Sequence, residues 1–173
     1  LVIPGSLRAR SSSNLILRSI ISFCPKDSRI EIYDAIGTLP HFNDPEQEPR
    51  QVMDLKRRIR EADAVLICTP EYAFGIPGSL KNALDWTVGS GEFVGKRVGI
   101  VTASSQGDKG HAALLLVLTA ISAKINEEAS LLISSVRAKL DSDGKVKDKE
   151  LEMKLRNVVS TLIEAVPKEI NTL

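Results

Sequence analysis

The sequence is poor in the residues that build disulfide frameworks and metal sites, since its 173 residues include only two cysteines and two histidines. Cys24 and Cys68 lie far apart and form neither a CxxC motif nor a metal-type spacing. We therefore expect two small, buried thiols in a cytoplasmic protein and no metal site. We expect His41 and His111 at the surface or behind a site rather than in catalysis.

The sequence also lacks an excess of charge and a long apolar run. Its 23 Lys and Arg residues face 22 Asp and Glu residues, which gives a formal net charge of +1. This balance predicts neither a nucleic-acid-binding surface nor a basic membrane patch. No run approaches the roughly 18 apolar residues that span a bilayer. We expect a soluble protein without a nucleic-acid or membrane partner, folded as a single domain over residues 1–173.

What the sequence does contain is an alternation of short Val- and Ile-rich runs with longer segments of helical period. This alternation predicts a three-layer α/β sandwich, either flavodoxin-like or half of a Rossmann fold. The flavodoxin-like alternative has a five-stranded parallel sheet of order 2-1-3-4-5. The predicted strands are Leu1 to Pro4, Arg29 to Tyr33, Ala64 to Thr69, Arg97 to Thr102 and Leu131 to Val136, and helices fit Pro77 to Val88 and His111 to Lys124, among others.

The first predicted strand is followed by GSLRARSSSN, Gly5 to Asn14, directly before a helix. A tight turn, several hydroxyls and the free N–H groups of a helix start together favour a phosphate site. Arg8 adds a planar set of donors that suits two phosphate oxygens. The alternative, a serine N-cap after a glycine turn, explains one serine but not four with an arginine. A dinucleotide site would need GxGxxG, and Asp34 as a ribose-binding acid carries little weight alone.

Two further loops follow the third and fourth predicted strands. The stretch CTPEYAFGIPGSLKNALDW, residues 68 to 86, holds two prolines and two glycines, which predict a rigid backbone whose N–H groups face a flat ring. We expect Gly75 to allow a close approach or an unusual backbone angle, so that Gly75→Val damages binding of that ring. A stiff strand-to-helix turn is the alternative. TASSQGDKG, residues 102 to 110, is small and hydroxyl-rich, as a backbone close to a ring requires.

Together these motifs resemble the NADPH-dependent FMN reductase family of flavodoxin-like proteins, which includes quinone, azo-dye and chromate reductases. The resemblance rests on GSLRxxS, on PEY followed by GIPGSLKNALDW, and on the SSxG loop; LPHFND at residues 39 to 44 and the turn at residues 141 to 144 extend it. Two departures stand out. The SSSN stretch is one residue longer than the usual SxN, and Ala73 replaces the asparagine that is common after PEY.

The resemblance implies which residues bind the cofactor FMN. Its phosphate would lie against the first loop, its ring against the second, and the third loop would close the far side. The implied cofactor-binding residues are Ser6, Arg8, Ser11, Ser13, Asn14, Pro70, Glu71, Tyr72, Ala73, Phe74, Ser104 and Ser105. No catalytic side chain is expected, because the flavin itself carries the redox chemistry.

The implied activity is ping-pong hydride transfer from NADPH or NADH through FMN to a flavin, a quinone or a similar small acceptor. A flavodoxin-type electron carrier for a protein partner is the main alternative, although its members commonly use strong charge for docking. A flavin-free phosphate-binding module is a third. We also expect a homodimer or homotetramer, because Leu80, Leu84 and Val88 form an apolar stripe that Ala83 and Trp86 widen.

Overall fold

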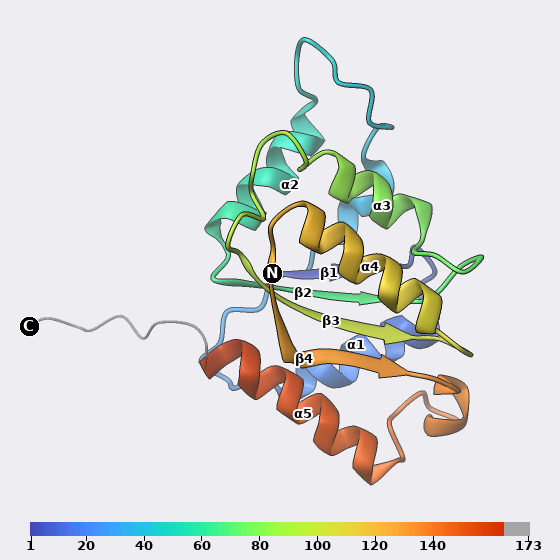
Figure 1. Cartoon of the computed structure of the whole chain (residues 1–173). Coiled ribbons are helices and arrows are strands. Elements are labelled where there is room, and N and C mark those ends of the chain that lie inside the picture. Colours follow the sequence, from blue (N-terminus) through green and yellow to red (C-terminus); the bar gives the residue numbers. More distant parts are fainter. Residues whose placement is uncertain (165–173) are drawn as a thin grey trace, which may run out of the picture.

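A four-stranded parallel sheet forms the centre of the computed structural model, which describes residues 1–164 (Figure 1). Strands β1 (Val2–Pro4), β2 (Ala64–Thr69), β3 (Arg97–Ala103) and β4 (Lys124–Ile133) lie in the order β1-β2-β3-β4. β2 and β3 are in the middle and are buried almost throughout, as expected for strands with helices on both faces.

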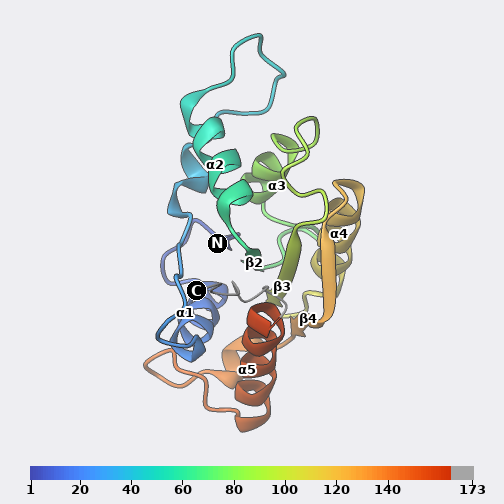
Figure 2. The same ribbon diagram turned by 90° about the vertical axis from the view of Figure 1, so that its left-hand side faces the viewer.

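Helices cover both faces of this sheet (Figure 2). The helices α1 (Ser12–Phe23) and α5 (Lys149–Glu164) pack on one face, where Ile16, Leu155 and Val101 share a core. On the other face lie α2 (Arg50–Glu61), α3 (Gly78–Asp85) and α4 (Asp108–Ala120), around a second core. The predicted three-layer α/β sandwich is therefore confirmed. Within residues 1–164, no helix has both the length and the apolar character needed to cross a bilayer.

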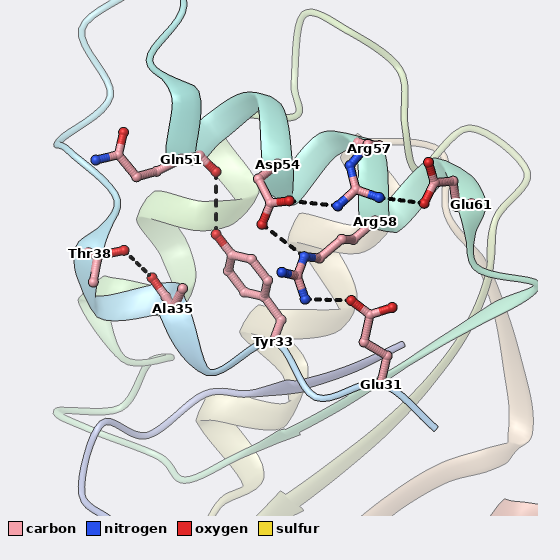
Figure 3. Close-up of polar contacts among 9 residues, drawn as sticks. All are labelled: Glu31, Tyr33, Ala35, Thr38, Gln51, Asp54, Arg57, Arg58 and Glu61. Carbon is pink, nitrogen blue, oxygen red and sulfur yellow. Dashed lines mark hydrogen bonds and ion pairs between the residues drawn. The ribbon is translucent and has the colours of Figure 1, made fainter. Parts of the chain in front are cut away.

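The prediction of a fifth strand at residues 29 to 33 is wrong. This segment makes only one parallel bridge, between Ile32 and Val2, so the five-stranded order 2-1-3-4-5 is not formed. Two backbone hydrogen bonds join it to Val2, from the Val2 N–H to the Glu31 carbonyl at 2.7 Å and from the Tyr33 N–H to the Val2 carbonyl at 2.8 Å. Side chains also tie the segment to α2 (Figure 3). Glu31 pairs with Arg58 of α2, and the Tyr33 hydroxyl donates to the Gln51 carbonyl at 3.4 Å.

The last strand lies earlier than predicted, at residues 124–133 rather than 131–136. Asn126, Glu127 and Glu128 break the apolar pattern in its first half, and the pairing with β3 is irregular there, between Val98 and Ile100. An edge strand exposes one side of its backbone to water, so it tolerates these polar residues. The predicted helices also shift: α3 is shorter than residues 77–88, and α4 begins at Asp108 rather than His111.

The apolar residues of α3 supply core rather than surface. Leu80, Ala83, Leu84 and Trp86 are all buried within the chain, and only Val88 is exposed. Our reason for expecting an oligomer at this helix was therefore wrong. The Trp86 indole is further fixed by its hydrogen bond to the Pro40 carbonyl, at 2.8 Å.

Candidate functional site

A cleft of about 1170 Å³ opens where β1, β2 and β3 end at their carboxyl termini. Ligands of open parallel sheets bind at this edge, in the crevice outside the strand ends. The loops that follow β1, β2 and β3 line the cleft, and residues 135–144 after β4 complete it. The three loops singled out in the sequence thus lie around one cavity.

The first loop turns sharply at Gly5, close against the end of β2. The Gly5 N–H donates to the Cys68 carbonyl at 2.8 Å. A Cβ atom at this position would lie 2.3 Å from Thr69 Oγ1 and 3.0 Å from its Cα. Only glycine therefore allows the first loop to pass this close to β2.

The first turn of helix α1 lines the cleft and has backbone N–H donors without a partner within residues 1–164. Ser11 is its N-cap, and the Ser11 hydroxyl accepts from the Asn14 N–H at 3.2 Å. The backbone N–H groups of Ser12 and Ser13 have no hydrogen-bond partner within residues 1–164. Arg8 is exposed beside them and forms no ion pair in the same part of the chain. This helix start therefore presents N–H groups, a positive dipole end and a guanidinium to an anion.

Asn14 shapes the first loop instead of lining the cleft. Its side-chain amide donates to the Arg8 carbonyl at 2.9 Å and to the Ser6 carbonyl at 3.4 Å. The Ser6 hydroxyl in turn accepts from the Arg8 N–H at 3.2 Å. These bonds fix the backbone on both sides of Arg8. The buried Oδ1 of Asn14 has no partner within residues 1–164 and is left as an acceptor.

The second loop forms a tight hairpin. Tyr72 and Gly75 exchange two backbone hydrogen bonds of 2.9 Å. The two residues between them carry the strain, because Ala73 and Phe74 have positive φ values of 49° and 59°. Gly75 itself has no unusual angle, and a Cβ there would meet only the Tyr72 carbonyl, at 3.8 Å. The unusual backbone angle that we expected as one possibility at Gly75 is therefore absent, while a close approach of a ligand at Gly75 stays a prediction.

Glu71 connects the second loop to α4. Its carboxylate accepts from the Gly110 N–H, in the first turn of that helix, at 2.7 Å. A carboxylate at a helix start satisfies a free donor and complements the dipole. Glu71 thus joins the second loop to the start of α4, which agrees with a positioning role for this side chain. A second bridge joins the second loop to the first, since the Tyr72 and Ser6 hydroxyls are 3.4 Å apart.

The third loop brings Ser104 and Ser105 to the cleft before α4 begins. Behind it, the His111 ring lies between two hydroxyls, with Nδ1 2.9 Å from Thr102 Oγ1 and Nε2 3.1 Å from Ser130 Oγ. Burial lowers the pKa of His111 below its ordinary value of 6.5. The ring faces β3 and β4 and does not line the cleft, as expected for a residue outside catalysis.

The cysteine beneath the site is inert. Cys68 is fully buried, its thiol donates to the Ser13 carbonyl at 3.2 Å, and burial raises its pKa to about 12. A thiol with this pKa remains protonated at neutral pH and is a poor nucleophile. Cys24 is partly exposed, so only Cys68 is as buried as the sequence suggested. Among residues 1–164, no three His, Cys, Asp or Glu side chains are grouped to hold a metal ion.

Most of the predicted binding residues share the cleft lining, while four lie outside it. Lining residues are Arg8, Ser11, Ser13, Pro70, Glu71, Tyr72, Ser104 and Ser105. Ser6 and Asn14 support the first loop from behind, and Ala73 and Phe74 form the tip of the hairpin, where Phe74 is 71% exposed. A role for any of these residues in binding FMN stays a prediction.

The sequence left open which serine of Ser11 to Ser13 would bind the phosphate. Ser12 lines the cleft and its hydroxyl has no partner within residues 1–164, whereas Ser11 is occupied as the N-cap. Arg10, Arg18 and Arg137 also line the cleft. These three arginines were not predicted as binding residues. Arg10 belongs to the GSLRARSSSN stretch, but no motif marks Arg18 or Arg137, and the fold brings Arg137 to the cleft from far along the chain.

A family model described as NADPH-dependent FMN reductase matches residues 1–137, which include all three loops. The chain belongs to the NADPH-dependent FMN reductase family. An NAD(P)H-dependent FMN reductase from Pseudomonas aeruginosa is 32% identical over 173 residues, with 95% of this chain and 90% of that protein covered. A quinone reductase from Escherichia coli is 38% identical over 86 residues, and the match spans about half of each protein, 47% of this chain and 46% of the other.

Solved structures of flavoenzymes share the fold of this family member. The flavoenzyme NAD(P)H:(acceptor) oxidoreductase from Paracoccus denitrificans superimposes with a TM-score of 0.82 at 29% identity, covering 95% of this chain and 94% of that one. An FMN-dependent NADH-azoreductase from Bacillus anthracis, solved with FMN, has a TM-score of 0.62 at 15% identity, with 96% and 98% covered. These similarities support a flavodoxin-like fold.

Proposed function

We propose that this protein binds FMN in the cleft and transfers electrons from NADPH or NADH to a flavin, a quinone or a similar small acceptor in a ping-pong reaction. The observation that carries the proposal is the convergence of two different surfaces on one cavity. One is an anion-binding helix start beside Arg8, and the other is a rigid hairpin that follows the neighbouring strand. A flavin mononucleotide has a phosphate for the first and a flat ring for the second.

The donors of the first loop suit the phosphate of FMN. A phosphate monoester is close to dianionic at neutral pH and accepts several hydrogen bonds. The N–H groups of Ser12 and Ser13, the Ser12 hydroxyl and the Arg8 guanidinium are available for these bonds. Arg8 needs no rearrangement of its backbone, because Ser6 and Asn14 already hold the residues around it.

The second and third loops suit the ring. Pro70 and Glu71 of the second loop and Ser104 and Ser105 of the third all line the cleft. When bound, FMN supplies the redox chemistry, accepting hydride from the nicotinamide and passing electrons to the acceptor. The chain itself has only to bind FMN and to orient it toward the nicotinamide and the acceptor. The carboxylate of Glu71 in the second loop accepts from the Gly110 N–H, so we assign it no proton transfer.

The names of the relatives point to the same reaction class. The Pseudomonas aeruginosa relative, which this chain covers almost completely, is named for NAD(P)H-dependent FMN reduction. A 2-hydroxy-1,4-benzoquinone reductase from a Burkholderia species, 31% identical with 84% of this chain and 83% of that protein covered, is named for a small quinone. We propose a small-molecule acceptor for this chain on that basis.

We further propose that the chain acts in the cytoplasm as a single FMN-binding domain, assembled as a homodimer or homotetramer. The two cysteines are separate, with one fully buried, as in proteins of reducing compartments. Leu116 of α4 is 73% exposed, and Val88, in the turn after α3, is 63% exposed. We propose that the interface covers these two apolar side chains. Light scattering at micromolar concentration tests the assembly.

The activity is tested by mixing the purified protein with FMN, recording the visible spectrum, and following NADPH and NADH consumption with several acceptors. We expect a bound-flavin spectrum and steady-state turnover with FMN or a quinone. Reduction of the bound flavin without turnover of any small acceptor would instead favour a flavodoxin-type carrier. Absence of flavin binding would reject the proposal.

A further inference from the structure

The side chain of His111, in the first turn of α4, joins that helix to two strands of the sheet. Its Nδ1 pairs with the hydroxyl of Thr102 on β3, and its Nε2 pairs with the hydroxyl of Ser130 on β4. Thr102 is fully buried, and within residues 1–164 its hydroxyl has no other side-chain partner. Each hydroxyl can donate or accept, so a neutral ring satisfies both contacts in either tautomer.

This polar cluster differs from the other contacts between α4 and the sheet. Leu114 and Leu118 are the buried leucines of the helix, and both pack in the apolar core. Apolar packing is non-directional, whereas a hydrogen bond holds particular atoms at a set distance and angle. The directional contacts of His111 lie at the end of α4 that follows the third loop. They therefore fix the start of the helix on the sheet.

Two loops of the cleft depend on the position of this helix start. The third loop ends at Gly107, whose carbonyl accepts from the His111 N–H at 2.9 Å. The second loop packs on Gly110, where a Cβ atom would lie 3.0 Å from the Glu71 side chain and 3.0 Å from the Gly75 carbonyl. The Gly110 N–H also donates to Glu71. Contacts this close transmit a small shift of α4 to the second loop.

We propose that His111 is a positioning residue of the flavin site, an inference that rests on the proposed function. Its hydrogen bonds to two strands fix the start of α4, and the start of α4 fixes the second and third loops. The ring does not line the cleft, so it acts through the backbone and takes no part in hydride or proton transfer. Within residues 1–164 no hydrogen bond joins the first loop to α4, so phosphate recognition should not depend on His111.

The choice of ligand tests this role. His111→Leu removes both hydrogen bonds and should weaken FMN and riboflavin by the same factor, about tenfold, because the loops beside the ring lose their fixed positions. Arg8→Ala should instead weaken FMN alone. His111→Asn places an amide near the position of Nδ1, beside Thr102, and should restore most of the affinity for both ligands. Fluorescence titration measures all three variants.

A double variant separates positioning from stability. His111→Leu leaves the buried Thr102 hydroxyl without a partner, so the midpoint of urea unfolding should fall. Adding Thr102→Val removes that hydroxyl, and the midpoint should return close to its original value. Riboflavin should still bind about tenfold more weakly, because the directional contacts are missing. Recovery of affinity together with stability would show a merely structural role and would overturn the proposal.

Leu118→Ala, near the other end of the same helix, is the matched control. Leu118 is fully buried, so the cavity left by alanine should lower the unfolding midpoint at least as far as His111→Leu does. Its affinity for riboflavin should stay at the original value, because the start of α4 keeps its hydrogen bonds. An equal loss of affinity in Leu118→Ala would overturn the proposal. The double variant carries the same comparison if His111→Leu alone does not fold.

Amide hydrogen exchange of the flavin-free protein decides the inference without using FMN. We expect the Gly110 N–H, which donates to Glu71, to exchange about tenfold faster in the His111→Leu/Thr102→Val protein and close to the original rate in His111→Asn. Unchanged exchange at Gly110 in the double variant would overturn the positioning role. Failure of the unmodified protein to bind FMN would reject the proposed function instead, and the exchange rates would still decide whether His111 fixes the helix start.

Discussion

The first and second loops end neighbouring strands and face the same cleft, yet they are held in opposite ways. In the first loop, side chains bind the backbone: the Ser6 and Ser11 hydroxyls and the Asn14 amide fix the residues around Arg8. In the second, the backbone binds itself, through the paired bonds of Tyr72 and Gly75, and the residues between them adopt left-handed angles. One loop is stabilised by its side chains and the other by its turn.

This difference matches what each loop is proposed to hold. A phosphate is recognised by charge and by N–H groups, so the first loop needs its donors free and its arginine placed. A flat ring is recognised by shape, so the second loop needs a fixed outline and no reactive group. Substitutions should therefore affect affinity at the first loop and local stability at the second.

The largest effect is expected at the point where the two loops meet. Gly5→Ala would place a Cβ atom 2.3 Å from Thr69 Oγ1 and 3.0 Å from backbone, so β1 and β2 must separate at their ends. Overpacking of this kind costs about 1–3 kcal/mol and occasionally more. Urea unfolding measures the loss, and FMN binding should weaken with it. Gly89→Ala, where nothing lies within 4 Å, is the matched control and should change neither property.

Arg8→Ala should reduce affinity without reducing stability. Losing a charge-assisted contact costs about 1.5–3 kcal/mol, an order of magnitude or more in the dissociation constant of FMN. Riboflavin has no phosphate, so its affinity should not change. Fluorescence titration with both ligands checks this prediction, and equal weakening of FMN and riboflavin would remove the assignment of Arg8 to the phosphate.

At the second loop, Glu71→Ala should lower stability where Glu71→Gln does not. Alanine leaves the Gly110 N–H without its partner, which costs about 1 kcal/mol, whereas a glutamine oxygen still accepts from it. Stopped-flow reduction by NADPH should be nearly normal in Glu71→Gln. Loss of reduction in that variant would show that the carboxylate moves a proton, and the positioning role would be wrong.

The smallest effect is expected at the strained turn. Ala73→Asn should raise the free energy of unfolding by up to about 1 kcal/mol, because asparagine adopts the left-handed region more readily than alanine. The same change at Ala112, exposed on α4, should cost about 0.7 kcal/mol or less, since alanine is the better helix former. Changes of the same sign in the free energy of unfolding at the two positions would contradict the strain at Ala73.

The sequence predicted the parts of this site that depend on neighbouring residues. A tight turn and a helix start favour glycine and serine, which made Gly5 and the serines around the start of α1, with Arg8 between them, recognisable. The prediction of a strand at residues 29 to 33 failed because the β-type pattern of this segment does not reveal the contacts of Glu31 and Tyr33 with α2. The partner of Glu71 lies 39 residues away at Gly110, and no periodicity encodes that contact.

The position of residues 135–144 at the cleft could not be predicted for the same reason. Backbone hydrogen bonds to Ser104 and Ser105 and the packing of Gly144 on Leu15 bring this segment to the cleft. The asparagine that is common after PEY in the family carried a usable signal. A left-handed angle at residue 73 favours asparagine, and Ala73 adopts that angle without it.

The central claim is that this cleft binds FMN where a nicotinamide can reduce it. Anaerobic stopped-flow mixing of the FMN-saturated protein with NADPH, in the absence of any acceptor, tests this claim most directly. The visible absorbance of the bound flavin should bleach at a rate that saturates with NADPH concentration, and it should return when a quinone is added. Bound FMN whose absorbance neither NADPH nor NADH changes would contradict the account.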